Sequence, residues 1–147
     1  MYRGAYSLLL LSSCLAAAGC SGDRRAEVSG TVKLNGEPIT EGSINFIPVE
    51  GNTGAGSGAE IRDGKYFIAR DKGVSPGKNR VELRAFRENG KKVQDPTGKK
   101  GTLTFERVMA FPPEFNDRST LVREVKPGSD TIDFDITAPI KSPDPVK

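Results

Sequence analysis

The amino-acid sequence predicts an all-β fold, an antiparallel β-sandwich of about seven strands. Apolar and polar residues alternate with a period of two in several short segments, which is typical of half-buried strands. Many of the 17 glycines and 10 prolines lie between these segments, where they mark turns. No amphipathic helical pattern accompanies them, so we expect strands packed face to face, and a barrel is the alternative architecture.

The first 19 residues are predicted to be a cleaved signal peptide. Arg3 precedes an apolar run at residues 6–18, which is shorter than the roughly 20 residues that cross a membrane as a helix. Small residues then precede Cys20, as in a bacterial lipobox. We expect cleavage before Cys20, a diacylglycerol on its thiol and a fatty acid such as palmitate on the new amino terminus, because two or more acyl chains hold a protein stably on a membrane. The sequence therefore predicts an exported lipoprotein that is anchored to a membrane of the cell envelope.

Cys14 is the competing lipidation site, because the three residues before it also have lipobox character. Lipidation there leaves a second apolar stretch on the mature chain, so Cys20 is favoured. A free Cys20 thiol in an ordinary secreted protein is the other alternative. If Cys20 carries lipid, the mature chain has no cysteine left for a disulfide, a metal site or a redox site. Ser21, rather than Asp, follows Cys20, which favours the outer membrane over the inner one.

Residues 20–26 are expected to be a tether, and the folded domain is predicted to span residues 27–138. Its first strand, with alternating apolar residues, ends at Asn35-Gly36, a pair that takes the positive φ angles of a tight hairpin turn. Residues 43–49 are predicted as the returning strand, which stops near Pro48 because proline cannot donate to a strand ladder.

A second hairpin is predicted around Asp63-Gly64, between strands at residues 59–62 and 65–70. Tyr66 and Ile68 are its expected core residues. Residues 79–87 alternate again and are predicted as the next strand.

The segment 88–101 is predicted as a mobile loop, because it is polar, rich in lysine and without periodicity. A short edge strand is expected at 102–108. The last two strands, 120–126 and 130–137, flank a turn at residues 127–129. The tail at residues 139–147 is rich in proline and is predicted to be disordered.

Three groups of turn and strand motifs carry a family resemblance. They are Val28-Ser29-Gly30-Thr31-Val32 with Asn35-Gly36-Glu37-Pro38-Ile39, Asp63-Gly64-Lys65-Tyr66-Phe67-Ile68, and Ser75-Pro76-Gly77-Lys78-Asn79-Arg80-Val81. These segments resemble the carboxypeptidase regulatory-like domains, whose transthyretin-like (prealbumin) fold is a β-sandwich similar in architecture to Ig-like domains. Asn79 and Arg80 depart from the family pattern. The C-terminal part resembles a group of small bacterial lipoproteins. The resemblance implies a rigid, non-catalytic module used for surface attachment, for carbohydrate or protein contact, or as a spacer.

The absence of histidine restricts the chemistry of the chain. Neither a Ser-His-Asp centre nor an imidazole zinc site can be assembled, so we expect no enzyme activity, no cofactor and no metal. A small hydrolase without histidine is an alternative, with Ser75 near Lys72 and Lys78 as its candidate residues. Asp133 and Asp135 lie two residues apart on one strand face and are weak candidates for calcium ligands.

Lys91, Lys92, Lys99 and Lys100 form a basic cluster in the predicted loop and are candidate surface contacts. A solvated loop is the simpler interpretation. The other is contact with anionic lipid headgroups or acidic polysaccharide near the membrane, since each basic residue is attracted to an anionic surface.

These observations predict a structural or interaction module that contacts an envelope protein or a polysaccharide. The net charge of +3 does not favour nucleic-acid binding. A carbohydrate-binding module is the alternative, and it requires exposed aromatic rings, for which Phe86, Phe111 and Phe115 are candidates. The absence of tryptophan counts against it.

Overall fold

The structure, a computed structural model, describes residues 25–139 and is nearly all β. The predicted signal peptide, Cys14, Cys20 and the tail from residue 140 onward lie outside the described residues. The elements are β1 (Glu27–Leu34), β2 (Glu37–Pro38), β3 (Glu41–Pro48), β4 (Ser57–Arg62), β5 (Lys65–Ile68), η1 (Arg70–Lys72), β6 (Gly77–Gln94), β7 (Leu103–Met109), η2 (Pro113–Phe115), β8 (Val122–Val125), β9 (Ser129–Thr131) and β10 (Phe134–Ile136).

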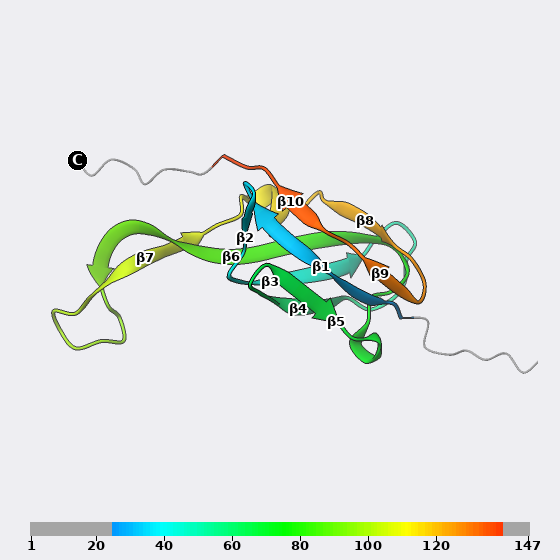
Figure 1. The fold of residues 1–147 in the computed structure, drawn as a ribbon, viewed down its shortest axis with the longest axis horizontal. Helices are drawn as coiled ribbons and strands as arrows, with labels where there is room; N and C mark the ends of the chain where they lie inside the picture. The colour runs from blue at the N-terminus through cyan, green and yellow to red at the C-terminus, as the bar shows by residue number, and fades with distance from the viewer. Residues whose placement is uncertain (1–24, 140–147) are drawn as a thin grey trace, which may run out of the picture.

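The strands form one hydrogen-bonded sheet that curls into a sandwich (Figure 1). Its order is β10-β1-β5-β4-β3-β6-β7, with β2 and β9 also paired to β1 and β8 paired to β6. β4 and β5 share a single residue pair, Arg62 with Lys65, and the sheet turns over at this corner. The predicted β-sandwich is thus confirmed. The pairings of β1 with β9 and β10 are parallel, whereas the other strand pairs are antiparallel.

The core lies between the two layers and centres on three aromatic rings. Phe46 of β3 lies 6.2 Å from Tyr66 of β5 and 6.4 Å from Phe134 of β10, measured between ring centroids. Aliphatic side chains from the same strand faces surround the rings; they are Val28, Val32, Ile44, Ile61, Ile68, Val81 and Leu83. The period-two alternation in the sequence marked these faces, because successive residues of a strand point to opposite sides.

The turn at Asn35-Gly36 forms as predicted, with φ angles of 54° and 84°. Its returning strand is the short β2, however, and β3 pairs with β4 and β6 instead. The assignment of residues 43–49 to this hairpin was therefore wrong. The physical reason lies at residues 39–40, whose carbonyls accept hydrogen bonds from Gly64 and Asp63 at 2.7 and 2.9 Å. These two hydrogen bonds hold residues 39–40 at the point where the chain crosses from β2 to the layer that contains β3.

The segment 88–101 is not a loop as expected, because β6 continues through it as far as Gln94. β7 pairs with this extension, and the two strands form an arm that projects beyond the sandwich (Figure 1). The pairing register shifts between Glu88 and Lys92, and Gly90 between them has a φ of 79°. Because neither face of the arm is buried in a core, the outer half of β6 lacks the alternation that identified the other strands.

The two ends of the domain are fixed by backbone contacts. Ala26 is fully buried and pairs with Val74, so it belongs to the domain and not to the tether. Near the other end, the Asn35 side chain donates to the Ala138 carbonyl at 3.0 Å and accepts from its amide at 2.9 Å. Within residues 25–139, no helix is long and apolar enough to cross a membrane.

The turn at residues 127–129 joins strands that do not pair with each other. β8 lies on β6, whereas β9 and β10 lie on β1. The strand predicted at 120–126 is β8, whereas the strand predicted at 130–137 is interrupted at residues 132–133 and forms β9 and β10. β8 and these two strands belong to opposite layers.

Candidate functional site

The β6–β7 arm carries most of the exposed apolar side chains of the domain. Phe86, Leu103, Phe105 and Met109 are 54%, 59%, 41% and 36% exposed, and they are four of the six large hydrophobic residues exposed in the described chain. Their exposure is unusual because side chains of this size are commonly buried.

All four side chains lie on one face of the arm. Residues 103, 105, 107 and 109 alternate along β7 and therefore share a face. Phe86 is paired with Met109, and directly paired residues of antiparallel strands point to the same side. Arg107 shares this face, and its guanidinium carbon lies 5.5 Å from the centre of the Phe86 ring, a cation–π contact. We call this surface the apolar face of the arm.

The opposite face of the arm carries Val93 and Val108 together with polar side chains that bond to one another. The Asn89 side-chain amide donates to the Glu106 carboxylate at 2.6 Å, and Lys91 forms an ion pair with the same carboxylate at 3.5 Å. The hydrogen bond from Asn89, and then the charge of Lys91, lower the pKa of Glu106. These bonds span the register shift, so they hold the two strands together where the ladder is interrupted.

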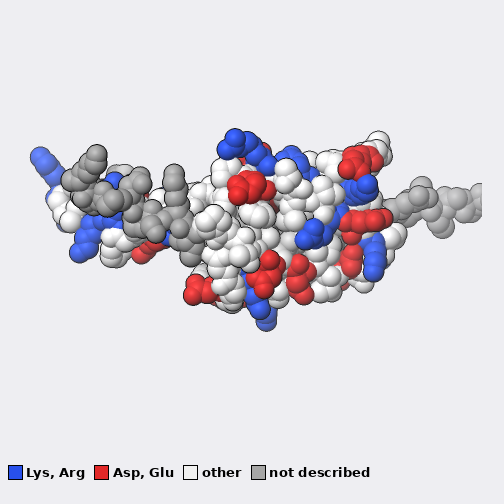
Figure 2. All heavy atoms as spheres, turned by 90° about the horizontal axis from the view of Figure 1, so that it is seen from above, with Lys and Arg blue, Asp and Glu red and all other residues white. Residues whose placement is uncertain are grey.

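The predicted basic cluster lies at the far half of the arm. Lys91 and Lys92 belong to β6, and Lys99 and Lys100 lie in the loop that joins β6 to β7. All four side chains are exposed, and only Lys91 has an ion-pair partner among residues 25–139. Figure 2 shows Lys and Arg side chains gathered at this end, whereas acidic and basic groups alternate over the sandwich. The arm therefore combines an apolar face with a positive tip.

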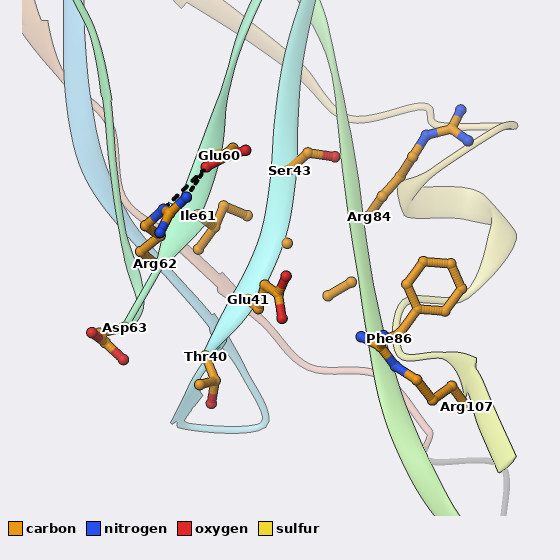
Figure 3. A pocket seen from close by; sticks show the side chains of 12 residues that line it. Thr40, Glu41, Ser43, Glu60, Ile61, Arg62, Asp63, Arg84, Phe86 and Arg107 are labelled. Carbon is orange, nitrogen blue, oxygen red and sulfur yellow. Dashed lines mark hydrogen bonds and ion pairs between the residues drawn. The ribbon is translucent and has the colours of Figure 1, made fainter. Parts of the chain in front are cut away.

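A hollow of about 600 Å³ adjoins the base of the arm, on the outer face of β3, β4 and β6 (Figure 3). Thr40, Ser43 and Ile61 contribute to its lining. Figure 3 shows Phe86 and Arg107 side by side at one wall and the Glu60–Arg62 pair at the other. The hollow and the apolar face thus share Phe86 and Arg107.

Two of the three arginines that line the hollow have acidic partners. Arg62 bonds to Glu60 at 2.5 Å, and Arg84 bonds to Asp117 at 2.6 Å. The pKa of Arg62 is raised by its hydrogen bond to Glu60, and the pKa of Arg84 is raised chiefly by its hydrogen bond to Glu82. Arginine pairs of this kind keep their protons, so they suit contact with polar groups and not proton transfer.

The candidate hydrolase residues have other bonding partners. The Ser75 hydroxyl donates to the Ala55 carbonyl at 3.3 Å, and the Lys78 ammonium pairs with Glu50. That hydrogen bond raises the pKa of Lys78, the opposite of what a lysine general base requires. The Lys72 carbonyl accepts a hydrogen bond from Ser57.

The candidate calcium ligands lie at the C-terminal strands. One oxygen of Asp133 accepts hydrogen bonds from the Thr31 amide at 2.7 Å and from the Thr31 hydroxyl at 2.8 Å. Asp135 is exposed on β10. Over residues 25–139, no group of three or more acidic, cysteine or histidine side chains converges on a common point. Asp133 therefore has a structural contact, which joins β1 to the segment before β10.

Sequence reasoning found the lysines of the arm and its exposed Phe86, but it missed the rest of the apolar face. The spacing of Leu103, Phe105 and Met109 is a period-two signal in the predicted edge strand, and it marks one apolar side. Phe111, proposed as an exposed ring, is instead buried, and Phe115 packs partly against the core.

Comparison with known proteins adds little. No family model matches this chain, and no curated protein matches it. Among solved structures, the chain is similar to a 9R-lipoxygenase from Cyanothece PCC8801, with 13% identity, a TM-score of 0.33 and coverage of 84% of this chain. The chain spans 18% of the length of that lipoxygenase. A similarity at this level carries no argument, and the family resemblance of the turn motifs stays a prediction.

Proposed function

We propose that this protein is a membrane-anchored envelope lipoprotein whose β-sandwich is a non-catalytic interaction module. The apolar face of the arm is the observation that carries the proposal. Large apolar side chains that are exposed together on one face of a domain mark a contact site, since their exposure to water is unfavourable. The arm presents this surface on two paired strands outside the core, where a partner has access to it.

The position of the domain ends agrees with this role. Ala26 pairs with Val74, close to the start of β6 at Gly77, whereas the arm is the far end of β6. The chain therefore leaves the sandwich toward Cys20 at the end opposite the arm (Figure 1). A lipid at Cys20 leaves the arm, the hollow and the charged outer face accessible.

The motif resemblance and the bonding of polar groups support a non-catalytic module. Carboxypeptidase regulatory-like domains, which the turn motifs resemble, serve for attachment and contact. The Ser75 and Lys78 side chains bond elsewhere, and Arg62 and Arg84 of the hollow have acidic partners. An envelope protein or a polysaccharide is the partner class that this proposal names.

Carbohydrate binding is the second candidate function, and one observation favours it. Phe86 and Phe105 expose their rings on the same face of the arm. Sugar rings stack on such aromatic surfaces. Titration of the protein with neutral oligosaccharides, followed through the chemical shifts of these two rings, tests this candidate. Binding that leaves both rings unperturbed rejects it.

The anchor is tested by mass spectrometry of the mature N-terminal peptide. We expect this peptide to begin at Cys20 and to carry the mass of a diacylglycerol and an acyl chain. Cys20→Ser is expected to remove the lipid and to move the protein from the membrane fraction to the soluble fraction. Cys14→Ser is the matched control and leaves both properties unchanged. An unmodified Cys20, or lipid on Cys14, contradicts the assignment.

A further inference from the structure

We infer that the β6–β7 arm binds an anionic lipid bilayer, with its apolar face in the headgroup region and its lysines against lipid phosphates. The inference deepens the proposed function, because it names the partner of the same contact surface. It rests on that proposal only in taking the arm as the contact surface.

The apolar face requires a partner that accepts hydrocarbon. A two-stranded hairpin is at best marginally stable alone in water, and it gains stability when an apolar face is covered. Phe86, Leu103, Phe105 and Met109 form such a face, and none of them belongs to the buried core. On the opposite face, the side chains of Asn89, Glu106 and Lys91 bond to one another and lie away from this apolar surface.

The positive charge of the arm favours a negatively charged partner. Four lysines and one acidic residue, Asp95, lie between residues 91 and 102. A second copy of this chain presents a tip of the same sign, which repels the first. An acidic polysaccharide matches the lysines but leaves Leu103 and Met109 in water. An anionic bilayer offers negative charge and hydrocarbon side by side, so it matches both features.

Cations lie beside the two rings of this face, and Glu88, which is paired with Arg107, also lies on it. Lys92 is paired with Phe105 across the two strands, and Arg107 lies over Phe86. Long basic side chains extend along apolar surface and keep their charged ends at the polar boundary. Each ring on this face therefore has a cation beside it that reaches the phosphates while the ring enters the lipid.

The anchor and the arm together define an orientation. Cys20 precedes Arg25 by five residues, so this stretch reaches at most about 18 Å. A lipid at Cys20 holds one end of the domain at that distance from the membrane. Contact of the arm at the opposite end then lays the sandwich along the membrane surface. The anchor also raises the effective concentration of the arm near the bilayer, so a weak intrinsic affinity is sufficient.

A single tryptophan reports on the arm, because the natural chain has none. Phe105→Trp in the full chain is mixed with vesicles of phosphatidylcholine, with or without phosphatidylglycerol. We expect a blue shift of its fluorescence and quenching by brominated lipid only when phosphatidylglycerol is present, and we expect salt to weaken both effects. Phe67→Trp is the matched control: Phe67 is 58% exposed on β5, away from the arm, so its tryptophan stays unshifted.

A charge variant separates the arm from the anchor. Replacement of Lys92, Lys99 and Lys100 by Gln, in the Phe105→Trp background, is expected to weaken the tryptophan response about tenfold or more. Lys91 is left in place, because it is paired with Glu106 on the opposite face of the arm. The apolar N-terminal segment also binds vesicles, so the readout is the tryptophan of the arm and not total vesicle binding. Circular dichroism checks that the variant keeps its fold.

Four results overturn the inference. They are no shift with phosphatidylglycerol, an equal shift without it, an equal shift of the Phe67→Trp control, and a shift with polygalacturonate but not with vesicles. A blue-shifted emission that depends on protein concentration before vesicles are added identifies a second copy as the partner instead. None of these results changes the mass of the N-terminal peptide, so failure of the arm and failure of the anchor are distinguishable.

Discussion

Phe46 is the residue on which the two layers meet. It is fully buried, and its ring contacts Tyr66 and Phe134 from the opposite layer. We expect Phe46→Ala to lower the free energy of unfolding by about 3–5 kcal/mol, because the loss of the ring leaves a cavity between the layers. Phe67→Ala on exposed β5 surface is the control, with an expected change within about 0.5 kcal/mol. Urea denaturation measures both, and equal midpoints for the two variants contradict this account of the core.

Asp133 gives the fold a specific dependence on acid. Its hydrogen bonds from the Thr31 hydroxyl and amide lower its pKa in the folded state. A lowered folded pKa means that the stabilisation is complete above the ordinary carboxyl pKa near 4 and is lost as the pH falls through the folded value.

We therefore expect Asp133→Asn to flatten the fall in stability as the pH drops below about 4. The urea midpoint of the variant is compared with that of the natural protein at neutral and acid pH. Asp135→Asn, at an exposed position two residues along, is the control and keeps the natural slope. An unchanged slope in Asp133→Asn shows that Thr31 does not stabilise the carboxylate.

Individual residues that set turns were predictable from sequence, because turn chemistry is local. Asn35 and Asp63 have the positive φ angles expected of them, and glycine follows each. The contacts of Asp133 were not predictable, since Thr31 lies 102 positions away in the chain. An alternating acidic residue on a strand gives the same sequence pattern whether it faces water or a neighbouring hydroxyl.

Strands were predictable wherever one face is buried, and the arm shows the limit of that rule. The alternation in β1, β3 and β10 reflects packing against a core. The outer half of β6 has no core beneath it, so its polar sequence resembled a loop. Its pairing with β7 is set by the cross-strand ladder and by the Asn89–Glu106 bond, which no single-strand pattern reveals.

The arm is expected to be dispensable for the fold of the sandwich. None of the fully buried core residues lies between Phe86 and Met109. Arg87 and Val108 are paired, so a two-residue Asn-Gly turn can join them in place of residues 88–107. We expect this shortened chain to unfold within about 0.5 kcal/mol of the natural protein in urea. It is also expected to lose the charge-dependent part of vesicle binding. A large loss of stability shows that the arm supports the sandwich.

At the scale of the whole molecule, the sandwich class followed from composition and alternation, whereas the pairing order did not. β8 and β9 are separated by a short turn and yet join opposite layers. β10 lies parallel to β1, a pairing between the two ends of the domain. Which strands pair depends on which strand faces pack together across the core. The residues that determine this packing are spread over the whole chain. The same holds for the hollow, which draws residues from β3, β4, β6 and β7.

β6 is the strand through which a mechanical load passes along the molecule. Its 18 residues extend over about 60 Å from the end that bears the N-terminal chain to the tip of the arm. Within the sandwich it is held on both sides, by β3 along seven residue pairs and by β8 along four. A pull between a membrane anchor and a bound arm is therefore directed along the strand. The hydrogen bonds of both ladders resist it together in shear, so the load is shared and the strand is not peeled away one bond at a time.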